Sequence, residues 1–200
     1  MEHPKLIYKG AEADLFVDGE KLIKKRVVKA YRIPELDASL RKYRTRHEAK
    51  IMEKILDFGF PAPKVLKVSE DEAVIEMEYI PGRVLKEVFE KDEEEAVNDL
   101  SVAVGETIRM LHHHNIVHND LTTSNMLVKD GRIYVIDWGL GYHSTRLEDK
   151  AMDLVVLKKS LRATHPRRFE AIWGHLLSGY KPGAEFSARV ETIESRVRYA

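Results

Sequence analysis

The first eighty residues carry apolar and polar side chains in short alternating runs, the pattern of β-strands with one buried face. Asp18-Gly19 interrupts this alternation as a two-residue hairpin signal. Apolar positions between residues 51 and 56 repeat instead at helical spacing, so we predict one helix from about Leu40 to Leu56. The predicted strands are Lys5–Lys9, Asp14–Val17, Glu20–Lys25, Lys64–Val68 and Ala73–Glu78.

Helical periodicity dominates the chain after Pro81-Gly82. Apolar residues at positions 97, 100, 104, 108 and 111 predict a long helix with one buried face, and Asp92 is its predicted N-cap. Two short apolar runs, Met126–Val128 and Ile133–Ile136, meet at Asp130-Gly131 and predict a second hairpin. Further helices are predicted over Asp149–Arg162, Arg167–Leu177 and Glu185–Arg198.

These elements predict an α+β chain of two lobes with a hinge near residues 79–82. Residues 1–80 form a small antiparallel sheet with one long helix, and residues 81–200 form a short, mostly helical lobe. Because 200 residues fit one ordinary domain or two small lobes, we interpret the two as halves of a single domain.

The composition narrows the class of protein. Hydrophobic residues make up 44% of the chain, enough for a sizeable core, and no uninterrupted apolar stretch is long enough to span a membrane. The N-terminus lacks the order of a secretion signal, and the absence of cysteine excludes disulfides and thiolate chemistry. We expect a soluble, cytoplasmic protein. The 33% of charged residues and the lack of glutamine suggest a thermophilic source.

Charge is distributed unevenly, although the formal net charge is zero. Eleven Lys and Arg residues lie between Lys21 and Lys50 against three acidic residues; we call these eleven the basic cluster. Residues 70–99 are strongly acidic. The basic cluster is either a surface that attracts a polyanion or a solvated face of a charge-rich protein.

The candidate catalytic and metal-binding residues lie in two segments, His118-Asn119-Asp120-Leu121-Thr122-Thr123-Ser124-Asn125 and the later Asp137-Trp138-Gly139. The two segments resemble the catalytic loop and the metal-binding triplet of the protein-kinase fold. Phosphoryl transfer from ATP requires Mg²⁺ bound by hard oxygen ligands, which Asn125 and Asp137 can supply, while Asp120 can accept the proton of an attacking hydroxyl. One such residue alone would be interpreted as a turn cap, but three in this order favour phosphoryl transfer.

The upstream residues fit the same fold independently. Lys24 lies on the third predicted strand, where the fold places a lysine that contacts the α- and β-phosphates, and Glu48 lies on the following helix, where its ion-pair partner belongs. Arg26 and Lys29 are rivals for the lysine role, but Lys24 suits the strand register best. Lys25 would point to the opposite face.

Two backbone segments complete the expected nucleotide site. Met77-Glu78-Tyr79-Ile80 resembles a kinase hinge, in which the backbones of Glu78 and Ile80 read adenine and Met77 packs behind it. Gly10-Ala11-Glu12-Ala13 stands where a protein kinase carries a glycine-rich phosphate loop.

The chain also departs from ordinary protein kinases. Residues 140–200 contain no Ala-Pro-Glu and are too few for both an activation segment and the peptide-docking helices. Asn119 replaces the arginine that would pair with an activation-loop phosphate.

With Gly-Ala-Glu-Ala, His-x-Asp-Leu-Thr-Thr-Ser-Asn, Asp-x-Gly-Leu-Gly and Glu148-Asp149-Lys150-Ala151, residues 6–200 closely resemble one family. It is the small atypical serine/threonine kinase of the KEOPS complex, also called the PRPK family, in its archaeal form. The resemblance implies Mg²⁺-ATP binding, autophosphorylation or phosphorylation of other proteins, and support of threonylcarbamoyladenosine modification of tRNA. In the complex its activity is expected to resemble ATP hydrolysis.

The resemblance also implies partners and site residues. A TsaD-like threonylcarbamoyltransferase would dock on the helical lobe and a small adaptor subunit on the strand-rich lobe. The basic cluster, with Arg196 and Arg198, would be available to tRNA, and no membrane is expected as a partner. The implied site residues are Gly10, Ala11, Glu12, Ala13, Lys24, Glu48, Met77, Glu78 and Ile80 for ATP, Asp120 and Lys24 for catalysis, and Asn125 and Asp137 for the metal.

Two other functions remain open, a free-standing kinase with a separate protein substrate and a nucleotide-binding scaffold without catalysis. The short helical lobe argues against the first, and the joint presence of Lys24, Asp120, Asn125 and Asp137 argues against the second. His112–His114 do not predict a metal site, since consecutive helical side chains point about 100° apart. We interpret them as a solvated helix end, and His118 as a support of the catalytic loop.

Overall fold

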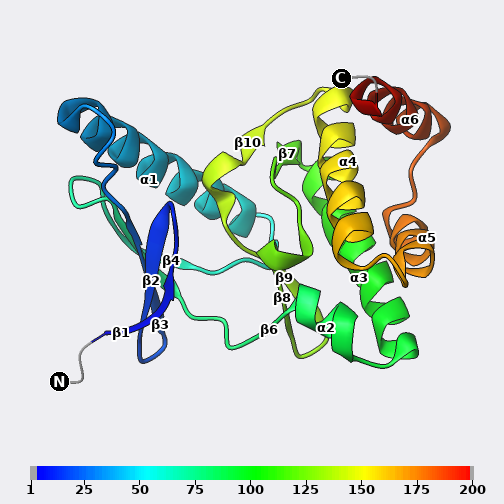
Figure 1. The fold of residues 1–200 in the computed structure, drawn as a ribbon, viewed down its shortest axis with the longest axis horizontal. Helices are drawn as coiled ribbons and strands as arrows, with labels where there is room; N and C mark the ends of the chain where they lie inside the picture. The colour runs from blue at the N-terminus through cyan, green and yellow to red at the C-terminus, as the bar shows by residue number, and fades with distance from the viewer. Residues whose placement is uncertain (1–3, 199–200) are drawn as a thin grey trace. The chain divides into compact units, whose positions relative to one another are not determined.

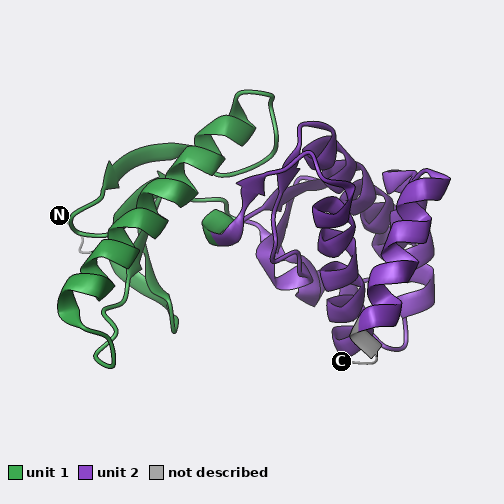
Figure 2. Cartoon of the chain, turned by 90° about the horizontal axis from the view of Figure 1, so that it is seen from above, with its two compact units in different colours: residues 1–81, 137–139 green, residues 82–136, 140–200 purple. Residues whose placement is uncertain are grey.

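The computed structural model describes residues 4–198, which divide into two compact units (Figure 2). The first unit contains residues 1–81 and 137–139, and the second contains residues 82–136 and 140–200. The boundary lies within the hinge expected at residues 79–82. However, residues 137–139, which the sequence placed in the C-terminal lobe, belong with the N-terminal unit.

The first unit is a five-stranded antiparallel sheet with one long helix, α1 (Figure 1). The strand order is β1-β2-β3-β5-β4, so β1 and β4 form the edges. Gly19, with φ of 59°, lies in the tight turn that joins β2 to β3, as the Asp18-Gly19 signal predicted. The elements are β1 Lys5–Lys9, β2 Ala13–Asp18, β3 Lys21–Arg26, α1 Pro34–Leu56, β4 Val65–Ser69 and β5 Val74–Glu78.

The helix α1 begins at Pro34, six residues before the predicted start at Leu40. Proline suits the first helical turn because its missing N–H has no intrahelical partner there. The carboxylate of Asp37 is buried and accepts a hydrogen bond from Arg41 Nε at 2.7 Å, one turn along the helix. These polar contacts, and not apolar periodicity, support the first turns, which is why the hydrophobic pattern missed them.

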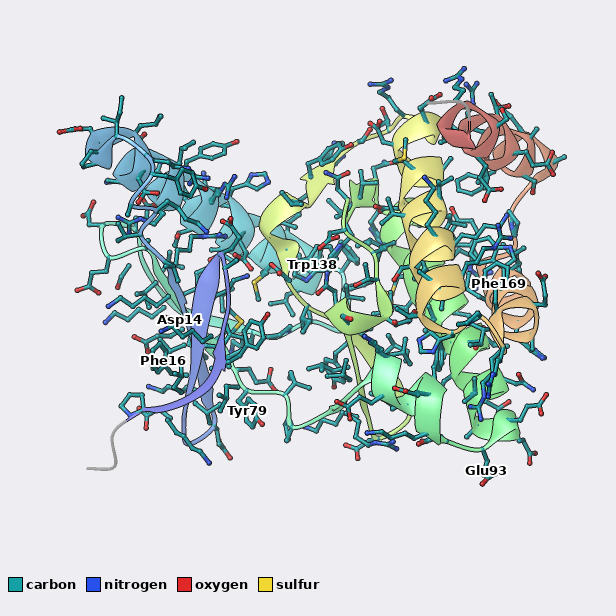
Figure 3. All side chains as sticks on the ribbon, viewed as in Figure 1. Asp14, Phe16, Tyr79, Glu93, Trp138 and Phe169 are labelled. Atoms are coloured by element: carbon teal, nitrogen blue, oxygen red, sulfur yellow. The ribbon has the colours of Figure 1, made fainter. Side chains whose placement is uncertain are left out.

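The core of the first unit lies between α1 and the sheet. Met52 and Ile55 of α1 are buried, as are Ile75 and Met77 of β5. Trp138, which Figure 3 labels, is fully buried and packs edge-on against Phe60 with ring centroids 5.6 Å apart. This contact attaches residues 137–139 to the first unit.

The second unit is mostly helical, with two small sheets (Figure 1). One sheet has the order β6-β8-β9, and the other pairs β7 with β10. Asp130 and Gly131 both adopt positive φ in the predicted turn between β8 and β9. The elements are β6 Arg83–Val84, α2 Leu85–Lys91, α3 Glu94–His113, β7 Ile116–Val117, β8 Met126–Lys129, β9 Arg132–Val135, β10 Tyr142–His143, α4 Leu147–Thr164, α5 Phe169–Tyr180 and α6 Ala184–Arg198.

The predicted N-cap of the long helix was wrong. Helix α3 begins after Glu93, labelled in Figure 3, and Asp92 instead follows the short helix α2, which the sequence did not predict as a separate element. The carboxylate of Asp92 accepts two hydrogen bonds from Arg83, at 2.6 and 2.7 Å. This bidentate pair engages the side chain that would otherwise cap α3.

Two glycines allow α3 and α5 to cross closely. A Cβ atom added to Gly105 of α3 would lie 2.0 Å from the carbonyl oxygen of Leu176, and one added to Gly179 of α5 would lie 2.1 Å from that of Val102. Any larger residue at either position would force the helices apart.

Candidate functional site

An ionic network in the first unit is built around Lys24, whose side chain is 11% exposed. Its Nζ donates a hydrogen bond of 2.6 Å to Glu48 Oε1 of α1 and one of 2.8 Å to Asp137 Oδ1. Lys25 is exposed, as the alternation of a strand requires. Burial alone would lower the pKa of Lys24, but the carboxylates of Glu48 and Asp137 outweigh it and hold that pKa above its ordinary value. Lys24 is therefore a charged ammonium group at neutral pH.

The second oxygen of Glu48 has its own cation. Arg26 Nη2 donates a hydrogen bond of 2.6 Å to Glu48 Oε2, so the carboxylate lies between Lys24 and Arg26. The sequence analysis left Arg26 as an alternative to Lys24 for the phosphate-contacting role. In the structure, both side chains bind Glu48. Alternation along β3 places their side chains on the same face of the strand.

The loop of residues 10–13 runs from the end of β1 to Ala13, the first residue of β2, and charged side chains hold it in place. Glu12 pairs with Lys29 at 3.4 Å and with Arg44 at 2.9 Å, and Lys29 also donates a hydrogen bond to the carbonyl of Ala11. A Cβ atom at Gly10 would lie 2.6 Å from the carbonyl oxygen of Ala13, so this position requires glycine. The carboxylate of Glu12 is thus engaged by cations of this chain, and its expected part in ATP binding stays a prediction.

The hinge segment follows β5. Met77 and Ile80 are buried, whereas Glu78 is exposed. The N–H of Glu78 donates to the carbonyl of Lys64 at 2.8 Å, and the N–H of Tyr79 donates to that of Glu20 at 2.8 Å. These bonds fix the backbone of the segment, and its expected contact with adenine stays a prediction.

The predicted catalytic loop lies in the second unit, between β7 and β8. Asn125 Nδ2 donates to both the carbonyl oxygen and the Oδ2 of Asp120, at 2.9 Å each. His118 is fully buried; its Nδ1 accepts the N–H of Asp120 at 3.3 Å, and its Nε2 lies 3.1 Å from the carbonyl of Ile136. His118 thus contacts the backbone at Asp120 and at Ile136, the residue before Asp137, as a supporting histidine should.

Asp153 of α4 anchors this loop, which the sequence did not predict. The side chain is 1% exposed, and its oxygens accept the backbone N–H groups of His118 at 2.7 Å and Asn119 at 2.6 Å. His112 Nε2 lies 3.2 Å from the same carboxylate, and His112 Nδ1 lies 2.9 Å from the hydroxyl of Tyr180. The interpretation of His112 as part of a solvated helix end was therefore wrong, because this histidine lies in a buried polar network.

Two residues of these segments adopt left-handed backbone conformations. Asn119 and Asp137 each have φ of 64°. Asparagine and aspartate tolerate this region better than other residues with a side chain, but it still costs energy. Backbone strain of this kind concentrates at functional sites.

The residues expected to hold Mg²⁺ fit that ion in their chemistry. The amide nitrogen of Asn125 is engaged by Asp120, so its oxygen is the atom that this side chain can offer a cation. The side chain of Asp137 is 52% exposed and offers carboxylate oxygens. Within residues 4–198 no cluster of three or more His, Asp or Glu could hold a metal alone.

Comparison with solved structures shows the fold. The Rio2 kinase of Chaetomium thermophilum, solved as an ADP/Mg²⁺-phosphoaspartate complex, matches 96% of this chain and 70% of its own, with a TM-score of 0.67 and 14% identity. The aminoglycoside phosphotransferase APH(2'')-Ib with bound ADP matches 96% of this chain and 81% of its own, with a TM-score of 0.70 and 16% identity. These likenesses confirm the predicted α+β, protein-kinase-like fold.

Sequence comparisons identify the family. The family model of the RIO domain matches residues 16–153, beginning just after the loop of residues 10–13. The KEOPS complex subunit Bud32 of Pyrococcus abyssi is 38% identical, and the match covers 98% of this chain and 96% of that protein. The chain therefore belongs to the RIO-domain family of atypical kinases, among the relatives of Bud32.

Other relatives are longer proteins. The probable bifunctional tRNA threonylcarbamoyladenosine biosynthesis protein of Methanocaldococcus jannaschii is 41% identical over 97% of this chain. The chain spans only 37% of the length of that relative. Within residues 4–198, no helix has the length and apolar character needed to cross a membrane.

Proposed function

We propose that this chain binds Mg²⁺-ATP and transfers or hydrolyses its terminal phosphoryl group. The observation that carries the proposal is the ammonium group of Lys24, which lies 2.6 Å from Glu48 and 2.8 Å from Asp137. A charged lysine kept in place by a helix glutamate is the arrangement that contacts ATP phosphates in the protein-kinase fold.

Each residue has a defined part in the proposed reaction. Lys24 contacts the α- and β-phosphates, and Glu48 orients it. Asn125 and Asp137 supply oxygen ligands to Mg²⁺, which when bound neutralises charge on the phosphates. Asp120 accepts the proton of the attacking hydroxyl or orients an attacking water. Asn125 holds Asp120 with one hydrogen bond to its carboxylate and one to its backbone carbonyl.

We further propose that the chain works within a KEOPS-type assembly that makes threonylcarbamoyladenosine in tRNA, in the cytoplasm. The support is the 38% identity over nearly the full length of the Pyrococcus abyssi subunit. A TsaD-like threonylcarbamoyltransferase is the partner proposed for the second unit, and a small adaptor subunit the partner for the first. The name of the longer relatives, a bifunctional tRNA threonylcarbamoyladenosine biosynthesis protein, supports the TsaD-like partner, since in those relatives a segment like this chain is part of a tRNA-modifying protein.

The acceptor of the phosphoryl group decides between this proposal and a free-standing kinase. The isolated chain should show slow autophosphorylation and weak activity on generic protein substrates, because positioning supplies much of the rate in phosphoryl transfer. Adding the TsaD-like partner and tRNA should raise phosphate release and suppress protein phosphorylation. Free phosphate and labelled protein are measured side by side, with Asp120→Asn as the control that should lose both while still binding ATP.

A different result would reject the assembly. If partner and tRNA leave phosphate release unchanged while one cellular protein is phosphorylated rapidly, the chain is a free-standing kinase. If Asp120→Asn turns over like the wild type, Asp120 has no part in the reaction.

The basic cluster is the surface of this chain that we propose for tRNA, but ion pairs reduce its free charge. Arg32 and Arg41 both pair with Asp37, for example, and Arg46 pairs with Glu70. The members with an ion pair in residues 4–198 are Lys21, Lys24, Arg26, Lys29, Arg32, Arg41, Lys42, Arg44 and Arg46.

The test of this surface uses its exposed or partly exposed members. Replacing Lys25, Lys42, Arg46 and Lys50 together by alanine should weaken tRNA binding and flatten its dependence on salt concentration. An unchanged salt dependence would make the cluster a solvated face. Arg41 is left intact because it neutralises the buried Asp37.

The C-terminal arginines are left unchanged in this test. Arg196 Nη1 pairs with Glu148 at 3.2 Å. Arg198 ends α6, and its side chain lies outside the described residues.

A further inference from the structure

Arg26 is a buried cation whose position the proposed reaction does not by itself explain. It ends β3, two residues after Lys24, and is 7% exposed. Its backbone N–H donates to the carbonyl of Ala73 at 3.0 Å. Arginine is rarely buried without an ion partner, since removing the guanidinium group from water is costly.

The guanidinium group connects three segments of the first unit. Nη2 donates to Glu48 Oε2 at 2.6 Å and lies 3.4 Å from the backbone carbonyl of Arg44, one turn earlier on α1. The same nitrogen would lie 3.4 Å from a Cβ atom placed on Gly139, so it also lies close to the segment that carries Asp137. Arg26 thus joins β3 to α1 beside residues 137–139.

The ion pair between Arg26 and Glu48 changes the balance of charge around Lys24. Lys24 is a single ammonium group between two carboxylates, Glu48 and Asp137. Without Arg26, the buried Glu48 would have Lys24 as its only cation in this network. A lysine that must neutralise a buried glutamate alone is less able to turn toward a phosphate. Arg26 supplies the second positive charge, so Glu48 stays paired when Lys24 contacts another anion.

In ordinary protein kinases, the activation segment and its phosphorylation control whether the helix glutamate reaches the lysine. This chain carries no Ala-Pro-Glu after Gly139 and has Asn119 in place of the arginine of that switch. Arg26 contacts α1 directly, through Glu48 and through the backbone carbonyl of Arg44. These contacts hold α1 against β3 without any part of an activation segment.

We propose that Arg26 is a positioning residue that holds Glu48, and through it Lys24, in the geometry that receives ATP phosphates, in place of an activation-segment switch. This inference rests on the proposed function, because it concerns the same phosphate-contacting lysine.

The test compares Mg²⁺-ATP affinity by calorimetry and turnover by phosphate release. Arg26→Met should weaken Mg²⁺-ATP binding by about tenfold or more, because it leaves a buried carboxylate oxygen without its hydrogen-bond donor. Arg26→Lys should lie between this variant and the wild type, since it keeps the charge but not the planar, multiply donating group. Arg189→Met, which removes a partly exposed ion pair with Glu148, is the control and should bind like the wild type.

A double variant separates positioning from a general loss of structure. If Arg26 acts through Glu48, then Arg26→Met combined with Glu48→Gln should bind Mg²⁺-ATP no more weakly than Glu48→Gln alone. If the double variant is weaker by the full factor of Arg26→Met, Arg26 acts independently and the inference is overturned. Should Arg26→Met fail to fold, Arg26→Lys, measured alone and in combination with Glu48→Gln, carries the same comparison.

Failure of the inference can be told from failure of the proposed function. Lys24→Met serves as the reference. If the wild type binds Mg²⁺-ATP, Lys24→Met does not, and Arg26→Met binds within about twofold of the wild type, only the role of Arg26 is rejected. If the wild type itself does not bind Mg²⁺-ATP, the proposed function fails, and the role of Arg26 fails with it.

Discussion

Replacing Asp153 by asparagine should both destabilise the second unit and slow catalysis. The carboxylate is buried and accepts the backbone N–H groups of His118 and Asn119 at 2.7 and 2.6 Å. Asparagine has nearly the same shape, but one of its two terminal atoms is a donor. At least one of the two N–H groups therefore loses its acceptor and faces another donor.

The size of the effect follows from these contacts. A buried donor left unsatisfied costs about 1–3 kcal/mol, and the contact with His112 at 3.2 Å also loses its charged acceptor. The free energy of unfolding should fall by about 2–4 kcal/mol, which for a chain of this length lowers the melting temperature by roughly 10 °C. Turnover should fall roughly 10- to 100-fold because Asp120 is displaced, while Mg²⁺-ATP affinity changes little.

Denaturant unfolding, phosphate release and calorimetric titration measure the three quantities. Asp99→Asn, at an exposed position of α3, is the matched control and should resemble the wild type. The reasoning fails if Asp153→Asn unfolds within about 0.5 kcal/mol of the wild type and turns over normally. In that case the two backbone hydrogen bonds do not hold the loop.

Three further predictions concern single residues. Lys24→Ala should lose phosphoryl transfer, whereas Lys25→Ala should keep most of it, because only Lys24 pairs with the glutamate of α1; a radiolabelled ATP assay decides, and the opposite result would reject the site. Asp137→Ala should abolish turnover and the magnesium dependence of ATP binding in calorimetry, and an unchanged dependence would remove Asp137 from the metal role. Burial holds the pKa of His165 below its ordinary value, so the unfolded chain binds the proton more readily and stability should fall as the pH drops below about 6.5. In urea unfolding, His165→Gln should show a weaker loss of stability between pH 7 and 5, and a loss equal to that of the wild type would refute this cause.

Local patterns in the sequence were enough to predict most of the strands and helices. Asp18-Gly19 and Asp130-Gly131 predicted their hairpins because a two-residue turn needs residues that accept positive φ, a property of the residues themselves. The strand Lys21–Arg26 has its predicted alternation, with Lys25 exposed and Lys24 turned toward Glu48. The order of Asp120, Asn125 and Asp137 in the sequence likewise predicts phosphoryl transfer, because that chemistry needs a base and oxygen ligands.

What these patterns missed depends on contacts between charged side chains, which leave no apolar periodicity in the sequence. The first turns of α1 rest on polar contacts of Asp37 with Arg32 and Arg41 and carry no apolar period. The predicted cap Asp92 was engaged by Arg83, nine residues away, because two charge-assisted hydrogen bonds compete effectively with a helix N-terminus.

The sequence by itself determined which residues could carry the chemistry, since residue type and short-range spacing define the donors, acceptors and turns available. The tertiary structure alone decided which of them meet. Asp153 lies 34 residues from Asn119, and Arg26 lies 22 residues from Glu48, so neither contact leaves a periodic signal in the chain. Folding brings these charges together in a buried environment, where each must find a partner. Because buried charges need partners, Asp153 accepts the backbone N–H groups of the catalytic loop and Arg26 serves as the second cation of Glu48.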